Sequence, residues 1–189
     1  MPIKKVVEKR TLSYYDDVSY TLSDLRRINL FGEVSSSLFS HIENSLSYMQ
    51  AKSPKKPVEI VMNTPGGSVI DGFAIYDSIR HYGKKMPINI TVSGACMSMG
   101  VVILQAATFR RATENAQFLL HEVSYGTRSN LSTQQDEHEQ AMKLQDRLDQ
   151  VIVQRSGIPL AELKQLIKRR DYALTAQEAL KHNLIDDIV

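Results

Sequence analysis

Residues 88–104, with the sequence INITVSGACMSMGVVIL, join a strand pattern to a helix pattern. Over residues 88–92, apolar and polar side chains alternate, as they do in a half-buried strand. Small residues follow, and the apolar run from Met99 to Ala107 then predicts a helix. Ser98 therefore stands where a strand ends and a helix begins.

A serine in this position has two interpretations. It can be an ordinary N-cap, whose hydroxyl accepts a hydrogen bond from the first turn of the helix. It can also be a nucleophile, because its oxygen lies clear of the sheet and near the positive end of the helix. A group that attacks a carbonyl would benefit from that position. The junction alone favours the N-cap, so the rest of the chain has to distinguish the two.

Strand and helix patterns alternate on both sides of this stretch. The sequence predicts strands over 27–32, 58–62 and 118–121, and helices over 35–50 and from Val69 onward. This alternation implies right-handed crossovers and a mostly parallel sheet, which is an α/β fold. Sites in such sheets collect at the carboxyl ends of strands. Gly66-Gly67, Ser98 and His121 all stand at such ends.

The second half of the chain has a different character. Residues 132–155 are polar, contain no Gly or Pro, and predict one long helix with a narrow apolar stripe. We expect this helix to pack against another copy of the chain. Gly157 would end it, a further helix would cover 160–168, and Thr175 with Glu178 would form a capping box. Residues 185–189 form a terminal apolar segment.

The composition favours one soluble domain, or one domain with an extension. The chain has 189 residues, of which 42% are hydrophobic, and this is enough for a core. A net charge of +2 argues against nucleic acid as a partner. Cys96 is the only cysteine, which excludes an internal disulfide and cysteine-based metal sites. With no signal peptide and no membrane-length apolar run in the sequence, we expect a cytoplasmic protein without a membrane partner.

Acyl transfer by a serine needs a base, an acid that orients the base, and donors for the oxyanion. Among the five histidines, His121 follows an apolar strand and is the preferred base, although a buried structural histidine fits the same pattern. The other four lie in amphipathic or long helices, where surface exposure or packing is the simpler interpretation: His41, His81, His138 and His182.

The oxyanion donors and the acid are less well defined. The backbone N–H of Met99 and the glycine pair Gly66-Gly67 could bind an oxyanion, since glycine lets a backbone approach a substrate closely. A simple turn is the alternative for the glycines. Periodicity does not select the acid, and the candidates are Asp16, Asp17, Asp71, Asp136, Asp171, Asp186 and Asp187.

Three ordered segments, NTPGGSV (63–69), GFAIYD (72–77) and ACMSMG (95–100), resemble the ClpP family of self-compartmentalised serine peptidases. The similarity continues to the C-terminus and covers roughly residues 27–189. It implies a crotonase-like α/β fold, a ββα spiral, from which the long helix at about 132–155 protrudes as a handle. Residues 1–25 would then be an N-terminal arm or pore-side segment, and residues 26–189 a ClpP-like peptidase domain.

The resemblance also assigns roles to individual residues. The implied triad consists of a nucleophile, a base and an orienting acid: Ser98, His121 and Asp171. The implied oxyanion amides are those of Gly67 and Met99, and the edge that binds the substrate strand is implied at Ser68 and Val69.

The implied activity is that of a serine endopeptidase, which hydrolyses peptide bonds in unfolded polypeptides or short peptides. The family uses no metal or organic cofactor for this chemistry. Its subunits form heptameric rings that stack as a tetradecamer and enclose the active sites.

Two departures from the family pattern keep alternatives open. Glu59 and Val61 stand where the family commonly has tyrosines that dock an unfoldase loop. They count against a Clp-type AAA+ unfoldase as a partner and favour a chaperone-independent processing protease. After His121, the chain has Glu-Val-Ser-Tyr-Gly where the family usually has Gln-Pro-Leu-Gly-Gly, which leaves a non-catalytic ring scaffold open.

Two further interpretations, one of the function and one of the nucleophile, are less favoured. A crotonase-type acyl-CoA enzyme would not need a serine with His121 and Asp171. Cys96 is disfavoured as the nucleophile, because the strand-to-helix turn would point its side chain in another direction than that of Ser98. Cys96 is better explained as a small buried hydrophobic residue.

Overall fold

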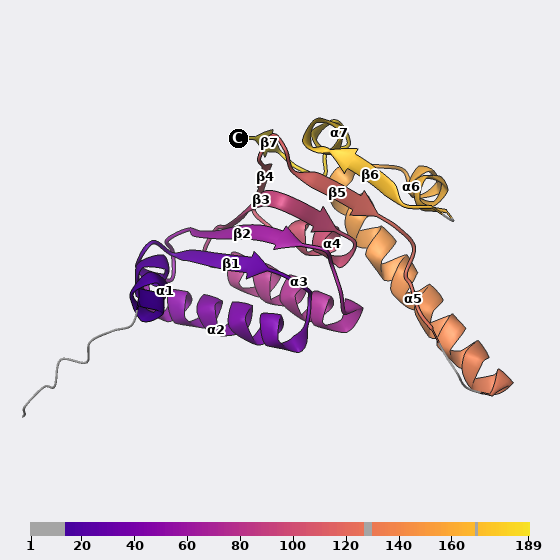
Figure 1. Ribbon diagram of the computed structural model, residues 1–189, viewed down its shortest axis with the longest axis horizontal. Coiled ribbons are helices and arrows are strands. Elements are labelled where there is room, and N and C mark those ends of the chain that lie inside the picture. The colour runs from indigo at the N-terminus through magenta and orange to yellow at the C-terminus, as the bar shows by residue number, and fades with distance from the viewer. Residues whose placement is uncertain (1–13, 127–129, 169) are drawn as a thin grey trace, which may run out of the picture.

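The computed structural model describes residues 14–126, 130–168 and 170–189. Figure 1 shows a twisted sheet with α2 and α3 lying side by side beneath strands β1 to β3. The strands are β1 (Arg27–Phe31), β2 (Val58–Thr64), β3 (Ile88–Met97), β4 (Phe109–Ala112), β5 (Gln117–Leu120), β6 (Tyr172–Thr175) and β7 (Asp187–Ile188). The helices are α1 (Tyr14–Asp24), α2 (Ser36–Lys52), α3 (Val69–Gly83), α4 (Met99–Leu104), α5 (Leu131–Ser156), α6 (Leu160–Ile167) and α7 (Ala176–Lys181).

The sheet is mostly parallel, as the sequence predicts. Strands β1, β2, β3, β4 and β7 lie in that order and pair in parallel. The central strand β3 has 10 residues and is longer than the predicted 88–92, because its two halves have different neighbours. Residues 89–92 pair with β4, and residues 95–97 pair with β5. Strand β6 runs antiparallel to β5. The end of β3 is therefore held between β2 and β5, and this position fixes the residue that follows it.

Helices with strong sequence signals form where the patterns predict them. The predicted helix 35–50 is α2, and the side chain of Ser35 caps it by accepting from the Leu38 N–H. The predicted helix 132–155 is α5, which ends at Ser156 and is followed by Gly157 in the left-handed conformation with φ 74°. The capping box of Thr175 and Glu178 is present at the start of α7. These local signals are sufficient because each depends on residues only a few positions apart.

Helix α4 is shorter than the predicted 99–107. The N–H groups of Gln105, Ala106 and Ala107 each donate to the carbonyl three residues earlier instead of four. These tighter bonds turn the chain out of the α-helix after Leu104, as is common at a helix end.

Three elements have no clear pattern in the sequence: α1, β4 and β6. Helix α1 lies within the segment 1–25 expected as an arm, of which residues 1–13 fall outside the described residues. The sequence pattern does not indicate β4, because two of its four residues are arginines. Arg110 is nevertheless only 4% exposed, because Asp186 and Gln105 accept hydrogen bonds from its guanidinium. Strand β6 is short and owes its position to pairing with β5.

The long helix α5 runs past the edge of the sheet. Its C-terminal half packs beside α4 and α6, whereas Figure 1 shows its N-terminal half extending away from the body of the molecule. Leu131 and Met142 on this half are 85% and 51% exposed. The predicted apolar stripe is thus only partly buried within one chain.

Candidate active site

Ser98 forms the junction between β3, which ends at Met97, and α4, which begins at Met99. Its φ of 52° and ψ of −120° are a strained combination for a residue with a side chain. The Ser98 N–H donates to the Leu119 carbonyl in β5 at 2.7 Å, which ties the junction to the next strand. The Ser98 side chain makes no cap hydrogen bond. The interpretation of Ser98 as an ordinary N-cap is therefore wrong, and its hydroxyl is left for other partners.

The loop between β2 and α3 lies directly against Ser98. Gly66 has φ 93°, and a Cβ atom on it would stand 2.7 Å from the Ser98 Cβ and 3.1 Å from the Met99 nitrogen. Gly67 has φ 143°, and a Cβ atom there would stand 2.5 Å from the Val34 carbonyl oxygen. Val34 is itself fixed, because its N–H donates to the Gly66 carbonyl and its carbonyl accepts from Ser68. Only glycine fits this close approach of two backbones at the serine.

Two backbone N–H groups near Ser98 have no acceptor among the described residues. The bonds to Val34 use the carbonyl of Gly66 and the N–H of Ser68, so they leave the Gly67 N–H unused. The Met99 N–H is the first of α4, and the first N–H groups of a helix have no partner within it. Ser68 caps α3 by accepting from the Asp71 N–H at 3.3 Å. Gly67 and Met99 thus offer two unoccupied donors in the same cavity that Ser98 lines.

A cavity of about 270 Å³ opens beside Ser98. Much of its wall is apolar, and this part comes from Pro65, Val69, Met99, Val102, Leu120, Val123, Leu148, Ile152 and Ile167. Its polar side chains are Ser98, His121, Ser124, Gln145 and Asp149. A cavity of this kind, apolar with a few converging polar groups, is the usual form of a binding site.

His121 follows β5 directly and shares the cavity with Ser98. Its Nδ1 lies 2.5 Å from the Glu122 carbonyl oxygen, which can only accept. Nδ1 therefore carries the proton, and Nε2 of the neutral ring is free to act as an acceptor. This is the tautomer that a general base at Ser98 requires.

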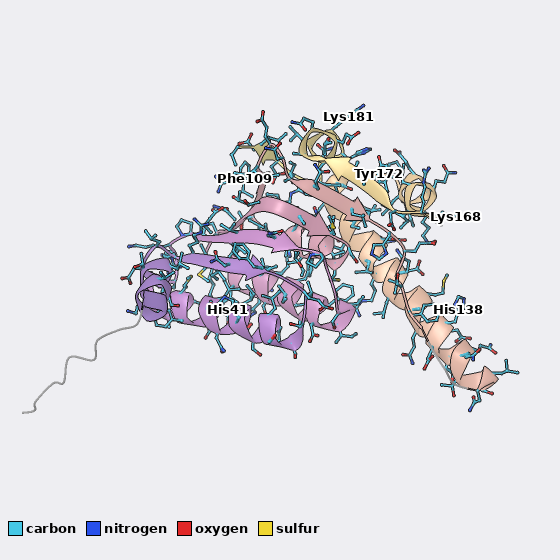
Figure 2. All side chains as sticks on the ribbon, in the orientation of Figure 1. His41, Phe109, His138, Lys168, Tyr172 and Lys181 are labelled. Atoms are coloured by element: carbon cyan, nitrogen blue, oxygen red, sulfur yellow. The ribbon has the colours of Figure 1, made fainter. Side chains whose placement is uncertain are left out.

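The other four histidines lie elsewhere. Figure 2 shows His41 on α2 and His138 on the part of α5 beyond the sheet. His81 is exposed on α3, and His182 lies 3.2 Å from the Tyr172 hydroxyl after α7. None of the four lines the cavity beside Ser98.

Asp171 is exposed and does not line the cavity. It directly precedes β6, whose register against β5 pairs Leu119 with Ala173 and Leu120 with Tyr172. One further step along this antiparallel register brings Asp171 opposite His121, and opposite residues share a face of the sheet. No hydrogen bond between described residues joins Asp171 to His121, or His121 to Ser98. The fold thus brings the three to one end of the sheet without linking their side chains.

Helix α5 contributes an acid that sequence reasoning missed. Asp149 lines the cavity and is only 1% exposed. Its Oδ1 accepts from Gln145 Nε2 at 2.7 Å, and Gln145 Oε1 accepts from the Val123 N–H at 2.7 Å. Its Oδ2 has no hydrogen-bond partner among the described residues. Burial raises the pKa of this carboxyl, and the Gln145 bond opposes the rise.

A spacing signal for Asp149 exists in the sequence. The buried face of α5 consists of Ala141, Asp149, Ile152 and Ser156, which recur at helical intervals. Because an aspartate in a charged stretch is normally exposed, this face does not stand out before the fold is known.

Cys96 is fully buried at the end of β3. Burial raises the pKa of its thiol well above the ordinary value, and the reactive form of cysteine is the thiolate. Cys96 is therefore unsuited to act as a nucleophile near neutral pH.

The surface at Glu59 is polar and internally paired. Glu59 Oε1 accepts from the Thr91 hydroxyl at 2.6 Å, and Glu59 Oε2 accepts from Arg111 at 2.8 Å.

Among the described residues, no group of three His, Cys, Asp or Glu side chains could hold a metal ion. None of the described helices is both long enough and apolar enough to cross a membrane.

Comparison with known proteins gives a match over nearly the whole chain. The profile of the Clp protease family matches residues 9–189. A protein of Deinococcus radiodurans, described as an ATP-dependent Clp protease proteolytic subunit, is 32% identical over 177 residues. The matched region covers 93% of this chain and 85% of that relative. The segments around Ser98, the glycine loop and His121 all lie within the residues that the family profile matches, and the chain belongs to the Clp protease family.

Proposed function

We propose that this chain is a serine endopeptidase that hydrolyses peptide bonds in unfolded polypeptides or short peptides. The observation that carries the proposal is Ser98, whose uncapped hydroxyl stands at a strained junction beside a cavity that His121 also lines. Family membership supports the reaction type, because the Deinococcus radiodurans relative is described as a proteolytic subunit.

In the proposed reaction, Ser98 attacks the substrate carbonyl while His121 Nε2 takes the hydroxyl proton. The N–H groups of Gly67 and Met99 bind the oxyanion, and each such donor lowers the barrier by about 3 kcal/mol. His121 then passes the proton to the leaving amine, and water hydrolyses the acyl-enzyme. Asp171 holds the imidazole and stabilises its cation, while Ser68 and Val69 form the edge along which the substrate strand lies.

This mechanism requires His121 to exchange one partner. Its Nδ1–H donates to the Glu122 carbonyl, and in the reacting state it donates to Asp171 instead. Residues 121–126 form no strand and are held along α5 by bonds from Val123 to Gln145 and between Tyr125 and His138. A shift of this segment on assembly or substrate binding would bring His121 to Asp171, since active sites are often aligned only in the complex.

We further propose that α5 is the handle of a crotonase-like ββα spiral, within a peptidase domain over 26–189 that follows an arm over 1–25. With 26 residues, α5 is about 39 Å long at the usual rise of ~1.5 Å per residue. Its exposed Leu131 and Met142 would pack against a second copy and join two heptameric rings as a tetradecamer. Native mass spectrometry tests this, and a protein that stays monomeric at micromolar concentration would contradict it.

The decisive test of the reaction is covalent labelling. A fluorophosphonate probe should modify Ser98 in the assembled protein, with a mass shift on the peptide that contains it. Ser98→Ala should lose both the label and peptide cleavage, whereas Ser93→Ala, five positions earlier in β3 and exposed, should keep both. An assembled protein that neither labels nor cleaves any peptide would refute the proposal.

One observation favours a second candidate, a non-catalytic ring scaffold. His121 bonds to the Glu122 carbonyl and not to Asp171, which is the arrangement of an unaligned triad. A scaffold would assemble into rings, and its parent chain would show no more peptidase activity than Ser98→Ala. A difference between the parent and Ser98→Ala excludes this candidate.

Within the peptidase proposal, we favour a processing enzyme that works without an unfoldase. Support comes from Glu59, whose carboxylate is already paired with Thr91 and Arg111 on the surface where the family resemblance expects tyrosines. Cleavage of an unfolded polypeptide without ATP should then proceed, and a Clp-type unfoldase with ATP should not accelerate it. Stimulated degradation of a folded substrate would count against this view.

A further inference from the structure

We infer that Asp149 makes the cavity beside Ser98 selective for a basic side chain, Lys or Arg, on the residue whose carbonyl is attacked. The inference rests on the proposed peptidase function and adds the substrate class to it.

The first argument is the unpartnered oxygen. Asp149 is 1% exposed, and its Oδ2 has no hydrogen-bond partner among the described residues. Buried polar atoms in proteins are nearly always bonded, because an unbonded one loses its hydration without compensation. Since Asp149 lies in the wall of the cavity, a ligand placed there can supply the missing donor.

The second argument is the local charge. The positive charge of Lys164 on α6 acts on Asp149 and opposes the rise in its pKa. The Lys164 Nζ itself is paired with another carboxylate, because it lies 3.0 Å from Asp146 Oδ1 at the surface. Glu122, which follows His121, adds negative charge near Asp149, whereas the paired charges of Lys164 and Asp146 act on Asp149 in opposite directions. The described residues therefore leave Asp149 without a paired cation, and a positive ligand group would be attracted there.

The third argument is the form of the cavity. Its volume of about 270 Å³ far exceeds the ~30 Å³ share of one water molecule, so it can take a whole side chain. Val69, Met99 and Ile152 are among the apolar residues of its wall, and the methylene groups of Lys or Arg can pack on such a surface.

The carboxylate is also held in place. The Val123 N–H orients Gln145, and Gln145 occupies Asp149 Oδ1, so Oδ2 is the oxygen left for a ligand. A wall that is apolar along its length and acidic at one position suits Lys or Arg better than Leu or Met. A neutral apolar side chain would leave Oδ2 as unsatisfied as it is in the free protein.

The test is a series of fluorogenic peptides that differ only at the residue before the cleaved bond: Lys, Arg, Gln, Leu and Met. In the assembled wild-type protein, we expect kcat/KM for Lys or Arg to exceed that for Leu by at least roughly tenfold. The ratio of the basic to the Leu substrate should fall about 100-fold in Asp149→Asn, which keeps the shape and removes the charge. Asp187→Asn is the matched control, because it makes the same chemical change at an exposed residue of β7 that does not line the cavity, and it should leave the ratio unchanged.

The pH dependence of the same ratio gives a readout that a structural role would not move. Effects of pH on the shared chemical step act on both substrates and cancel in the ratio. Because Asp149 binds a cation only when ionised, the ratio should fall as the pH decreases, beginning above the range of an exposed aspartate since burial raises the pKa. In Asp149→Asn the ratio should not depend on pH in this range.

The outcomes separate this inference from the proposed function. If Ser98 labels and Leu or Met is cleaved as well as Lys and Arg, the selectivity is wrong and the peptidase function stands. A ratio that Asp149→Asn leaves unchanged also overturns the selectivity. If no peptide of the series is cleaved and Ser98 does not label, the peptidase function fails and the inference fails with it. If Asp149→Asn does not fold, the ratio of kcat/KM for Lys or Arg to that for Leu in the wild-type protein tests the inference by itself.

Discussion

Replacing Gly67 with alanine would test whether the glycine loop serves as an oxyanion site. The added Cβ would stand 2.5 Å from the Val34 carbonyl oxygen and 2.9 Å from the Val34 nitrogen. To reach an ordinary contact of 3.4 Å, the two backbones would have to separate by about 0.9 Å. Neither side yields easily, because Val34 is bonded to both Gly66 and Ser68.

The displacement should reduce turnover far more than substrate binding. A shift of ~1 Å at a positioned group costs roughly 100-fold, and loss of one oxyanion donor costs roughly 100- to 1,000-fold. We therefore expect kcat of Gly67→Ala to fall at least 100-fold with little change in KM, because the oxyanion exists only in the reacting complex. The φ of 143° adds strain of about 1–3 kcal/mol, which should lower Tm by roughly 5 °C.

The assay is steady-state cleavage of a fluorogenic peptide by the assembled protein, with native mass spectrometry to confirm that assembly is unchanged. Gly83→Ala is the matched control, because a Cβ at this last residue of α3 has no atom within 4 Å. It should keep full kcat. A Gly67→Ala protein that assembles normally and retains kcat within about threefold would refute the assignment of Gly67 to the oxyanion site.

Three further predictions follow from the same geometry. Asp171→Asn should lower kcat roughly 10,000-fold if Asp171 orients His121, as measured by peptide cleavage, whereas a decrease below tenfold would remove it from the triad. Cys96 should resist alkylation by iodoacetamide at pH 8 in the folded protein and react fully in denaturant, and alkylation in the native state with loss of activity would contradict the serine assignment. Burial alone would raise the pKa of Asp186, but the bonds from Arg110 hold this pKa below the ordinary value. The ionised Asp186 therefore stabilises the fold fully above about pH 4, and this stabilisation is lost as the pH falls through the lower pKa of the folded state. Asp186→Asn should accordingly lower Tm at pH 7 by roughly 10 °C, because it leaves buried Arg110 without its anion, and the difference from wild type should shrink in acid; equal Tm values at pH 7 would contradict this.

The helices and strands around the site can be predicted from local sequence patterns. Strand β4 and the position of Asp171 cannot. The strand into Ser98, the glycine loop and the histidine after β5 are all visible as apolar runs that end in small or polar residues. Strand β4 is invisible in this way because Arg110 is buried only through Asp186, which lies 76 positions later. Asp171 is likewise selected by the family resemblance and not by periodicity, because its relation to His121 arises from the β5–β6 register.

The sequence by itself determined the α/β class, the long helix and the serine at the mouth of α4, because strand alternation, helical spacing and small residues act over a few neighbouring positions. Only the tertiary structure decided that the Ser98 hydroxyl caps nothing, that Gly67 touches Val34, and that Asp149 faces the same cavity as Ser98. Each of these depends on the packing of segments far apart in the chain, where backbone approach and desolvation change what a residue does. Asp149 shows the difference most clearly, because its polar neighbours in sequence suggest exposure and its neighbours in space remove it from water.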